Sequence, residues 1–347
     1  MKESLRLPLI VDLDNTLIRT DCLLEALFYN LKKNFFKTII FFFIHFFNKK
    51  KIKSYLFSDF CPDINSIKVN KKIYDFLSKE RSNGRKIYLC SGSPSKVVKQ
   101  FSEKLKIFDG YFGTENVNLV GENKKNFLNE KFKIYQYDYI GDSYSDITVW
   151  KNSNQAIVSK NNILIKIILK IKKIKFITIT EKNKVISNVI NLLKLIRIHH
   201  WCKNILLFLP IFLAQDFSIR SIVFCSIGFL AFSLIASCIY IVNDCLDIQN
   251  DRLHPEKKNR ILASGKILLL DAMFISLTLA IISISFSTFI GTYFTILICF
   301  YFITNILYSI TIKNLIIFDI ICLSLFYVSR VIAGGLSTNT FVSIWLL

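Results

Sequence analysis

The sequence has no arrangement of cysteine and histidine that would build a disulfide framework or a zinc site. Its nine cysteines are scattered, none belongs to a CxxC pair, and only four histidines occur in 347 residues. Isolated cysteines of this kind are typical of reduced, buried side chains that pack as small hydrophobic groups. The pattern therefore argues against zinc-binding and disulfide-rich classes of protein.

The sequence also lacks a secretion signal at its start and is poor in acidic residues. The first apolar run, residues 7–11, has the length of a strand and stops at Asp12. Lys and Arg total 45 against 25 Asp and Glu, which gives a net charge of +20. Nucleic acid is one partner for such a charge, but the basic residues mostly flank apolar segments. That placement favours the cytoplasmic loops of a bacterial inner-membrane protein and no nucleic-acid partner.

The composition indicates a soluble half followed by a membrane half. Hydrophobic residues make up 52% of the chain, and the mean hydropathy is +0.42. The apolar residues gather after about Ile205. Since a chain of this length is expected to hold about two domains, we predict a soluble domain over residues 1–160, a basic linker over 161–191 and a transmembrane domain over 192–347.

Strands alternate with helices in the soluble half. Strands are predicted at residues 8–11, 86–90 and 137–140, and helices at 69–81 and 95–105. This alternation predicts a Rossmann-like α/β domain with a parallel sheet.

A helical cap is expected over residues about 22–80, between the first and second strands. Its stretch 35–47 is apolar but has only 13 residues, whereas a bilayer requires about 20. The stretch is therefore expected to pack on the soluble domain or to lie in the membrane interface. The linker mixes Ile and Leu with Lys, and two interpretations stay open: the last elements of the soluble domain, or an amphipathic segment on anionic lipid.

Residues with the chemistry of phosphoryl transfer follow the predicted strands. They are Asp12, Asp14 and Thr16 after the first strand, Ser91 at the end of the second, Asp142 and Asp146 after the third, and Lys124 before a helical stretch. The carboxyl ends of parallel strands meet in one crevice. Phosphoryl transfer to a carboxylate needs a nucleophile, a proton donor, Mg²⁺, and hydroxyl or cationic groups for the phosphate oxygens. The set supplies each of these parts.

In this order the set resembles the haloacid dehalogenase (HAD) superfamily of phosphatases, over roughly residues 7–160. The resemblance implies that Asp12 is the nucleophile that forms an aspartyl-phosphate and that Asp14 is the general acid and base. It also implies a phosphoryl site made by Thr16, Ser91 and Lys124, and a Mg²⁺ site made by Asp12, Asp142 and Asp146. Lys125 is an alternative for the lysine. Asp14 favours a phosphatase over a dehalogenase, because a leaving alcohol needs a proton.

The second half is predicted to be an all-α bundle of transmembrane helices. Five spans are expected at residues 205–217, 221–242, two within 272–312 that turn at Gly291, and 315–333, with a sixth that begins near Phe341. The basic segments then fall on one side of the membrane, which the positive-inside rule makes cytoplasmic. The soluble domain and both predicted sites share that side.

An acidic motif lies at the end of the uncharged run 221–243. Asp244, Asp247 and Asp251 have the spacing i, i+3 and i+7, which predicts one face of a helix. Carboxylates near a membrane are costly unless a cation neutralises them, and Mg²⁺ prefers few carboxylates together with phosphate oxygens. The motif therefore predicts a Mg²⁺–diphosphate site. An ordinary solvated loop is the alternative, which the cationic segment 254–260 directly behind the motif disfavours.

Residues 192–347 resemble the UbiA-type membrane prenyltransferase superfamily in three segments, 196–204, 240–265 and 328–335. The HPxKxxR element at 254–260 makes the match closest to the decaprenyl-phosphate phosphoribosyltransferase branch. The resemblance implies transfer of 5-phosphoribose from phosphoribosyl pyrophosphate to a polyprenyl phosphate. It places Mg²⁺–pyrophosphate on the three aspartates and phosphate on Lys203, Lys257, Lys258, Arg260, Lys313 and Arg330. Lys313 and Arg330 also fit an interfacial anchor and a snorkelling side chain.

The match departs from the superfamily at two points. Ile261 stands where a proline usually follows the arginine, and the superfamily's later spans and second polar motif are not in this sequence. We therefore expect an incomplete transferase half, with a separate chain as a possible source of the missing spans. Three functions stay open: a bifunctional enzyme whose HAD half removes the 5-phosphate, an aromatic prenyltransferase of quinone synthesis, and a phosphatase tethered by an inactive transferase half.

Overall fold

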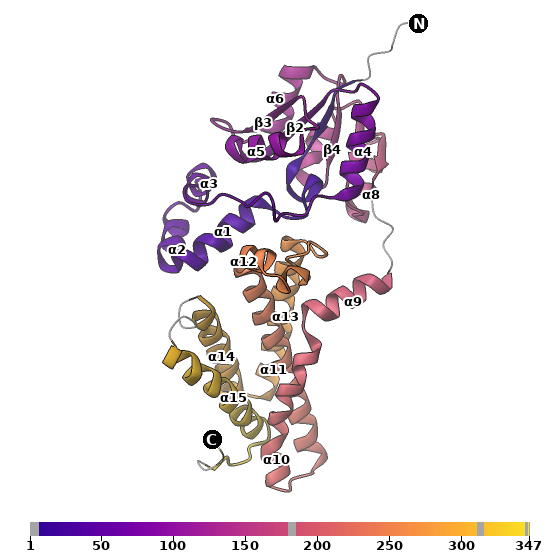
Figure 1. Ribbon diagram of the computed structural model, residues 1–347. Helices are drawn as coiled ribbons and strands as arrows, with labels where there is room; N and C mark the ends of the chain where they lie inside the picture. Colours follow the sequence, from indigo (N-terminus) through magenta and orange to yellow (C-terminus); the bar gives the residue numbers. More distant parts are fainter. Residues whose placement is uncertain (1–6, 180–184, 311–315, 344–345, 347) are drawn as a thin grey trace, which may run out of the picture. The chain divides into compact units, whose positions relative to one another are not determined.

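A six-stranded parallel sheet forms the centre of the first of two units into which the chain divides (Figure 1). The computed structural model describes residues 7–179, 185–310, 316–343 and 346. The first unit comprises residues 1–30 and 37–184, and the second comprises residues 185–347 with the short segment 31–36. Each unit is described by itself.

The sheet has the strand order β3-β2-β1-β4-β5-β6, and every neighbouring pair is parallel. The strands are β1 (Leu9–Val11), β2 (Ile87–Pro94), β3 (Gly110–Thr114), β4 (Asp138–Gly141), β5 (Gln155–Val158) and β6 (Phe176–Thr178). The three strands expected from the sequence are confirmed, and so is the Rossmann-like α/β class. β1 lies between β2 and β4, so the carboxyl ends of these three strands are neighbours.

Helices cover both faces of this sheet, as a parallel sheet requires. Leu9 and Val11 pack in one hydrophobic cluster and Ile10 packs in another, which is the period-two alternation of a strand. The first cluster includes residues of α4 (Lys71–Ser82) and α5 (Ser95–Leu105). The second includes residues of α6 (Glu122–Phe132), α7 (Ile147–Trp150) and α8 (Ile163–Ile171).

The cap consists of α1 (Cys22–Lys33), α2 (Phe35–Ile44) and α3 (Lys49–Leu56). Ala26, Leu56 and Phe60 form its small core, whereas α4, at the end of the expected cap range, packs on the sheet. Thr38 is the buried residue of α2, and Phe36, Ile40 and Phe43 on the same helix are exposed. α2 therefore contributes little to the core of the first unit.

Residues that were expected to lie in the linker add two elements to the first unit. α8 buries Ile165 and Leu169 against the sheet, and β6 pairs with β5 as the last strand. For residues 163–178 the structure thus has the last elements of the soluble domain. Exposed Ile163, Leu164 and Ile167 explain why the segment also has the pattern of a lipid-facing helix.

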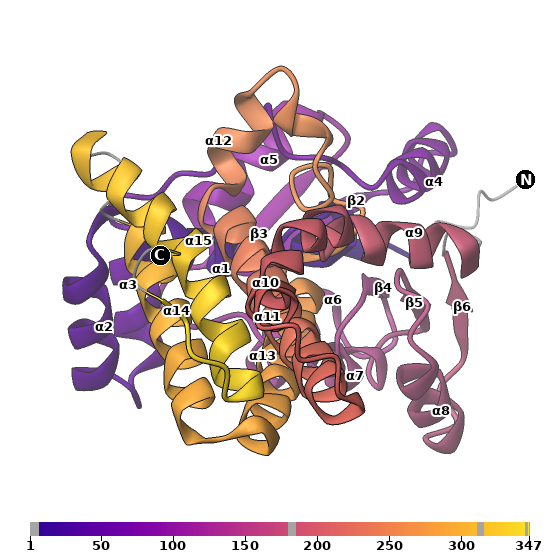
Figure 2. The ribbon, with the colours of Figure 1, turned by 90° about the horizontal axis from the view of Figure 1, so that it is seen from below.

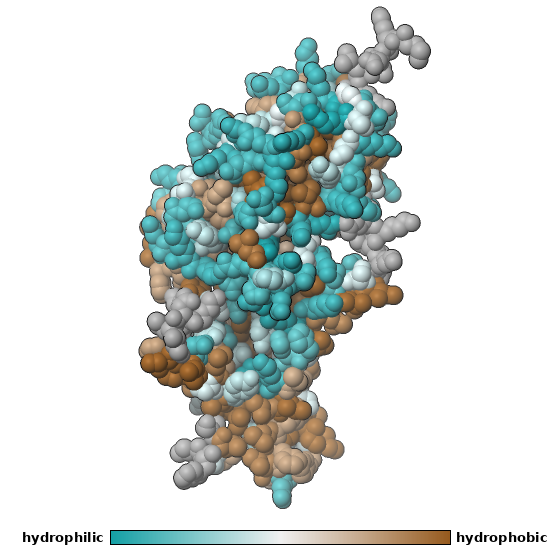
Figure 3. Space-filling view, in the orientation of Figure 1, coloured by the Kyte–Doolittle hydropathy of each residue, from teal (hydrophilic) through white to brown (hydrophobic). Residues whose placement is uncertain are grey.

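The second unit is helical, with four helices long and apolar enough to cross a membrane among the residues described (Figure 2). They are α11 (Ile219–Leu246), α13 (Leu269–Ile290), α14 (Thr292–Ile310) and α15 (Ile316–Thr338). α11 contacts the other three. Gly291, with φ +154°, separates α13 from α14 and confirms the predicted turn. In Figure 3, hydrophobic side chains gather over these helices, whereas the visible face of the first unit is mostly hydrophilic.

The first predicted span, residues 205–217, does not form a spanning helix. The structure has a shorter apolar helix, Ile198–Leu213, built from η3 (Ile198–Phe208) and α10 (Leu209–Leu213). The polar turn that begins at Gln215, where φ is +54°, ends the run. Residues 341–343, near the expected start of a sixth span, have no helical structure, and residues 344, 345 and 347 lie outside the described residues.

Four shorter elements complete the second unit. They are α9 (Val185–Leu195) before η3, then α12 (Ile248–Leu253) and the short η4 (Lys257–Asn259) after α11, and the turn-rich segment 260–268 that leads into α13. The acidic motif begins near the end of α11 with Asp244, and its other residues and the cationic segment lie between α11 and α13.

Candidate functional site

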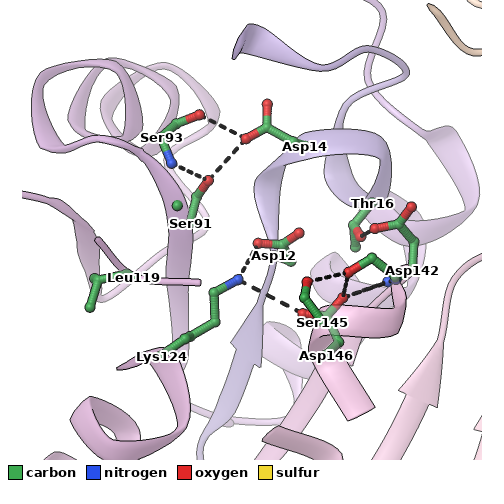
Figure 4. Close-up of polar contacts among 12 residues, drawn as sticks. Asp12, Asp14, Thr16, Ser91, Ser93, Leu119, Lys124, Asp142, Ser145 and Asp146 are labelled. Atoms are coloured by element: carbon green, nitrogen blue, oxygen red, sulfur yellow. Dashed lines mark hydrogen bonds and ion pairs between the residues drawn. The ribbon is translucent and has the colours of Figure 1, made fainter. Parts of the chain in front are cut away.

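The backbone directly after β1 makes the sharp turn that creates the first site (Figure 4). Asp12 follows the buried strand, and its N–H donates to the Ile140 carbonyl of β4 at 2.9 Å. Asn15 has φ +56° in the following turn, a left-handed conformation that asparagine adopts more readily than most residues. The turn places the carboxylates of Asp12 and Asp14 at the carboxyl edge of the sheet, where β2 and β4 also end.

A chain of buried polar contacts links Asp12 to Asp146. The ammonium of Lys124, on α6 and 4% exposed, lies 2.7 Å from Asp12 Oδ1 and donates to the Tyr139 hydroxyl at 2.8 Å. Tyr139 in turn donates to Asp146 Oδ1 at 2.9 Å. Lys125, the alternative, instead pairs with Glu122 of its own helix. The structure therefore directs Lys124 to the predicted nucleophile, with Tyr139 as a partner that the sequence did not indicate.

Three carboxylates meet around this chain. Ligand oxygens of Asp12, Asp142 and Asp146 lie within 4.8 Å of one another. Burial, with the nearby charges of Asp146 and Asp14, raises the pKa of Asp12 to about 7 despite Lys124, and burial beside Asp146 and Asp12 raises the pKa of Asp142 well above its usual value. The Lys124 ammonium by itself does not balance three carboxylates. Carboxylate oxygens are the donors that Mg²⁺ prefers, so the residues present fit that ion.

The Asp146 carboxylate is fixed by the backbone of its own loop. The N–H groups of Asp142 and Ser143 donate to Asp146 Oδ2 at 3.2 and 3.0 Å, and the Ser143 hydroxyl donates at 2.8 Å. A Cβ on Gly141 would lie 2.6 Å from the same oxygen. Only glycine at this position leaves room for the carboxylate to approach β4 so closely.

Asp14 accepts three hydrogen bonds at the edge of the site. The Ser91 and Ser93 hydroxyls donate to its Oδ2 at 3.0 and 2.7 Å, and the Cys22 N–H donates to Oδ1 at 2.8 Å. Ser91, predicted as a phosphate ligand, thus contacts the predicted acid and base. Thr16 donates to Asp142 Oδ1 at 3.3 Å. Ser93 was not predicted, although its i+2 spacing from Ser91 places both side chains on the same side of the chain.

A cap lysine also reaches this edge. Lys53, on α3, donates to the Gly92 carbonyl and, at 2.8 Å, to Asn118 Oδ1. Burial lowers its pKa, because the charged form loses hydration there. Gly92 lies between the two serines that hold Asp14. Nothing in the sequence distinguishes Lys53 from the other lysines of α3, so its place depends on the tertiary fold.

The acidic motif of the second unit is divided between two helices. α11 ends at Leu246 and α12 begins at Ile248, with Asp247 at the junction. The expected single helical face over the three aspartates is therefore wrong. Asp244 and Asp251 are 6% and 3% exposed, and Asp247 is half-buried.

Arginines balance the two buried aspartates. Arg260 Nη1 lies 3.1 Å from Asp244 Oδ1 and 2.8 Å from Asp251 Oδ2. Arg197 Nη2 lies 2.5 Å from the same oxygen of Asp244. Within the described residues, the motif does not bring three ligand oxygens as close together as the first site does. Its buried carboxylates fit Mg²⁺ by donor chemistry, in competition with the two guanidinium groups.

The other predicted phosphate contacts divide into three groups. Lys203, Lys257 and Lys258 are exposed, and Lys313 lies outside the described residues. Arg330 is 5% exposed and donates to Asn204 Oδ1 at 2.8 Å. It therefore does not snorkel.

Aromatic rings and neutral oxygens enclose the Arg330 guanidinium. It also donates to the Phe326 carbonyl and, at 3.3 Å, to the Tyr301 hydroxyl. It lies over the rings of Phe232, Tyr301 and Tyr327 at 5.3–5.7 Å from the centroids. These contacts join α15 to η3, α11 and α14, and none of them is with the acidic motif. Arg330 is thus separate from the cluster around Arg260.

The fold and the first site define a phosphoryl-transfer hydrolase domain, and the second unit is that of a membrane protein. Residues 9–151 match the family model of haloacid dehalogenase-like hydrolases, and residues 205–347 match that of the UbiA prenyltransferase family. The chain therefore carries a HAD-like domain followed by a UbiA-family domain. Both resemblances inferred from the sequence, and their order, are confirmed.

One relative of the chain matches nearly all of it, and others match its second half. An uncharacterized protein y4nM of Sinorhizobium fredii is 28% identical over 98% of this chain and 66% of its own length. A decaprenyl-phosphate phosphoribosyltransferase of Corynebacterium glutamicum is 32% identical over 45% of this chain and 48% of its own length. A solved UbiA homolog from Archaeoglobus fulgidus is 22% identical over 44% of this chain and 56% of its own, with a TM-score of 0.38. The chain spans between about half and two thirds of these relatives.

Proposed function

We propose that the chain makes and then trims a lipid-linked sugar phosphate at the cytoplasmic face of a bacterial inner membrane. The UbiA-family domain transfers 5-phosphoribose from phosphoribosyl pyrophosphate to a polyprenyl phosphate, and the HAD-like domain removes the 5-phosphate. The observation that carries the phosphatase half is the convergence of Asp12, Asp14, Lys124, Asp142 and Asp146 at one edge of the sheet. Similarity to proteins named decaprenyl-phosphate phosphoribosyltransferase supports the transferase half.

In the phosphatase half, the free oxygen of Asp12 attacks phosphorus. Lys124 holds Oδ1 at 2.7 Å, which leaves Oδ2 to form the new P–O bond as the ester P–O bond breaks. Protonated Asp14 gives its proton to the leaving alkoxide. Water then attacks the aspartyl-phosphate, Asp14 takes a proton from it, and inorganic phosphate leaves. Asp12, Asp142 and Asp146 would hold Mg²⁺, and the bound ion would supply positive charge for the phosphate oxygens.

The serines and the cap lysine set the geometry of these steps. Ser91 and Ser93 hold the Asp14 carboxylate, and Lys53 holds the backbone between them through the Gly92 carbonyl. A proton donor works only within hydrogen-bond reach of the leaving oxygen. The cap therefore acts on catalysis through the end of β2 that positions Asp14, and Thr16 and Ser91 offer hydroxyls to the phosphoryl group.

In the transferase half, the acidic motif binds the pyrophosphate of the donor together with Mg²⁺. Asp244, Asp247 and Asp251 would hold the cation, and Lys257, Lys258 and Arg260 contact the phosphates. Lys203 and Lys313 are further proposed phosphate contacts. An oxygen of the polyprenyl phosphate forms a bond with C1 of the ribose while the bond from C1 to pyrophosphate breaks. Pyrophosphate leaves, and the 5-phosphate stays on the sugar.

The test is a substrate comparison with the full chain in liposomes that contain a polyprenyl phosphate and Mg²⁺. One sample receives phosphoribosyl pyrophosphate, and the other receives a polyprenyl diphosphate with 4-hydroxybenzoate. We expect a ribosylated lipid in the first sample and no prenylated aromatic product in the second. Prenylated 4-hydroxybenzoate alone would establish the quinone-pathway alternative. Phosphate release from small phosphomonoesters without any lipid product would leave only a membrane-tethered phosphatase.

A further inference from the structure

Two arginines of the chain itself occupy the acidic motif. Asp244 Oδ1 accepts from Arg197 at 2.5 Å and from Arg260 at 3.1 Å, and Arg260 also reaches Asp251 Oδ2 at 2.8 Å. Both carboxylates are almost fully buried. Two negative and two positive charges therefore cancel locally, and a cation that enters this cluster has to replace a charge partner that is already present.

The two arginines are not held equally. Arg197 stacks over the Tyr240 ring at 5.0 Å and starts η3 from a left-handed backbone with φ +51°. Its side chain is 19% exposed, against 32% for Arg260. Arg260 directly follows the short η4, and in the described part of the chain its guanidinium donates to Asp244 and Asp251 alone. Moving Arg260 away from its carboxylates therefore costs less free energy than moving Arg197.

Neither half of a metal–diphosphate complex binds well alone to such a cluster. A divalent cation that takes the oxygens of Asp244 and Asp251 leaves the Arg260 guanidinium without an anion. A diphosphate that pairs with Arg260 takes that partner from the buried Asp251 and leaves Asp244 with Arg197 alone, while it brings more negative charge close to both carboxylates. When both arrive, every charge keeps a partner, because the cation takes the carboxylates and Arg260 takes the diphosphate.

We propose that Arg260 is an exchangeable counter-ion that makes cation binding and diphosphate binding depend on each other at this site. The inference rests on the proposed function, since it takes the acidic motif as the place where a diphosphate binds. Arg260 leaves Asp244 and Asp251 as the cation enters and pairs with the diphosphate, while Arg197 keeps its contact beside Tyr240. The site therefore selects a cation–diphosphate complex over either free ion.

The coupling between cation binding and diphosphate binding can be measured, and replacing Arg260 should change the two affinities in opposite directions. Coupling between two ligands is reciprocal and typically changes each affinity by about 5–150-fold. With Arg260→Gln, the cation no longer competes with the guanidinium. We expect Mn²⁺ alone to bind on the order of tenfold more tightly, which corresponds to about 1.4 kcal/mol. Pyrophosphate binding in the presence of Mn²⁺ weakens in the same variant, and the coupling falls below about threefold. A purely structural role for Arg260 would weaken both ligands together.

The experiment measures Mn²⁺ binding by electron paramagnetic resonance and labelled pyrophosphate binding by filtration, on the full chain in nanodiscs. Every protein carries Asp142→Asn, so that the three-carboxylate cluster of the first unit does not contribute. Binding that Asp244→Asn abolishes defines the site. Lys266→Gln removes one exposed charge from the same segment and serves as the matched control. Arg260→Lys keeps the charge but loses the two-pronged geometry, and we expect coupling between that of the parent and that of Arg260→Gln.

Opposite shifts for Mn²⁺ and pyrophosphate in Arg260→Gln, with both ligands unchanged in Lys266→Gln, support the exchange. Two outcomes overturn the exchange without affecting the proposed function. One is unchanged coupling in Arg260→Gln. The other is weaker binding of both ligands in Arg260→Gln while Arg260→Lys keeps the coupling of the parent. Absence of any binding that depends on Asp244 overturns the exchange and the diphosphate site together. If Arg260→Gln does not fold, Arg260→Lys tests the exchange: weaker coupling than in the parent supports it, and coupling equal to that of the parent overturns it.

Discussion

The two acidic clusters of this chain balance their charge in different ways. At the edge of the sheet, three carboxylates gather around the ammonium of Lys124, and Lys160 adds positive charge near Asp142. In the helical unit, Asp244 and Asp251 are matched by Arg197 and Arg260. The first cluster has a deficit of positive charge, which a divalent cation offsets before any substrate is present. In the second, the two buried carboxylates already have guanidinium partners, so the cluster gains from a cation only when an anion accompanies it.

The difference follows from how each cluster is supported. Asp12 and Asp142 follow β1 and β4, which are paired in register, and Asp146 is fixed by backbone N–H groups of its own loop. Such carboxylates are held close together whatever their charge. The second cluster depends on a helix end at Asp247 and on side chains from separate segments. Its geometry is set by the ion pairs themselves, so it is expected to rearrange when a ligand replaces one partner.

The largest expected effect separates the two reactions at the first cluster. Asp12→Asn removes the nucleophile and should lower phosphate release by at least about a thousandfold, while the yield of lipid product stays as it is. Asp75→Asn, the same change at an exposed position on α4, is the control. Release of inorganic phosphate and extraction of labelled lipid are measured in the same sample. Parallel loss of both products would mean that the two clusters do not act separately.

The corresponding change in the second unit is Asp244→Asn. Since loss of groups that merely support a metal site costs about 10–100-fold, loss of a proposed ligand should reduce lipid product by at least about a hundredfold. Hydrolysis of a soluble phosphomonoester should stay unchanged. Glu256→Gln, an exposed neighbour, controls for charge. Normal lipid product from Asp244→Asn would remove the acidic motif from the reaction.

A smaller effect sharpens the account of the first cluster. Ser93→Ala deletes one of three hydrogen bonds to Asp14, and a bond to a charged group is worth about 1.5–3 kcal/mol. We expect kcat for phosphate release to fall at least about tenfold with little change in KM. Ser82→Ala, an exposed serine at the end of α4, should have no effect. A rise in KM at constant kcat would instead assign Ser93 to substrate binding.

The smallest effect concerns an exposed cation of the second unit. Lys203→Gln should raise the KM for phosphoribosyl pyrophosphate only about two- to threefold, because exposed charges are screened by salt and contribute little. The change should shrink further as the salt concentration rises. Lys266→Gln is the control for net charge. A rise in KM of tenfold or more that persists at high salt would place Lys203 in direct, water-excluded contact with the substrate.

The sequence was most informative where function lies at the ends of regular elements. Short apolar strands alternating with helices predicted the sheet, and the strand ends predicted that Asp12, Ser91 and Asp142 lie together. Tyr139, Ser93, Lys53 and Arg197 could not be predicted in this way. Their roles come from tertiary contacts: Tyr139 bridges two charged groups, and Lys53 reaches Gly92 in β2, 39 positions away.

Periodicity was less reliable in the helical unit. The i, i+3, i+7 spacing of the three aspartates predicted one helix through Asp247, whereas in the structure α11 ends one residue earlier, at Leu246. Hydropathy suggested a span at 205–217, but the apolar helix there is Ile198–Leu213, which starts earlier, ends before the turn at Gln215 and is shorter than the four candidate spans of the described residues. Spacing also says nothing about a buried cation such as Arg330, whose surroundings of Asn204, Tyr301 and aromatic rings exist only after packing.

The most direct test of the central claim, two distinct sites that act in sequence, is mass analysis of the lipid product from three proteins. Wild type, Asp12→Asn and Asp244→Asn are each reconstituted with Mg²⁺, phosphoribosyl pyrophosphate and polyprenyl phosphate. The account predicts ribosyl lipid without the 5-phosphate from the wild type, ribosyl lipid that keeps the 5-phosphate from Asp12→Asn, and no ribosylated lipid from Asp244→Asn. The same dephosphorylated lipid from wild type and Asp12→Asn would contradict it.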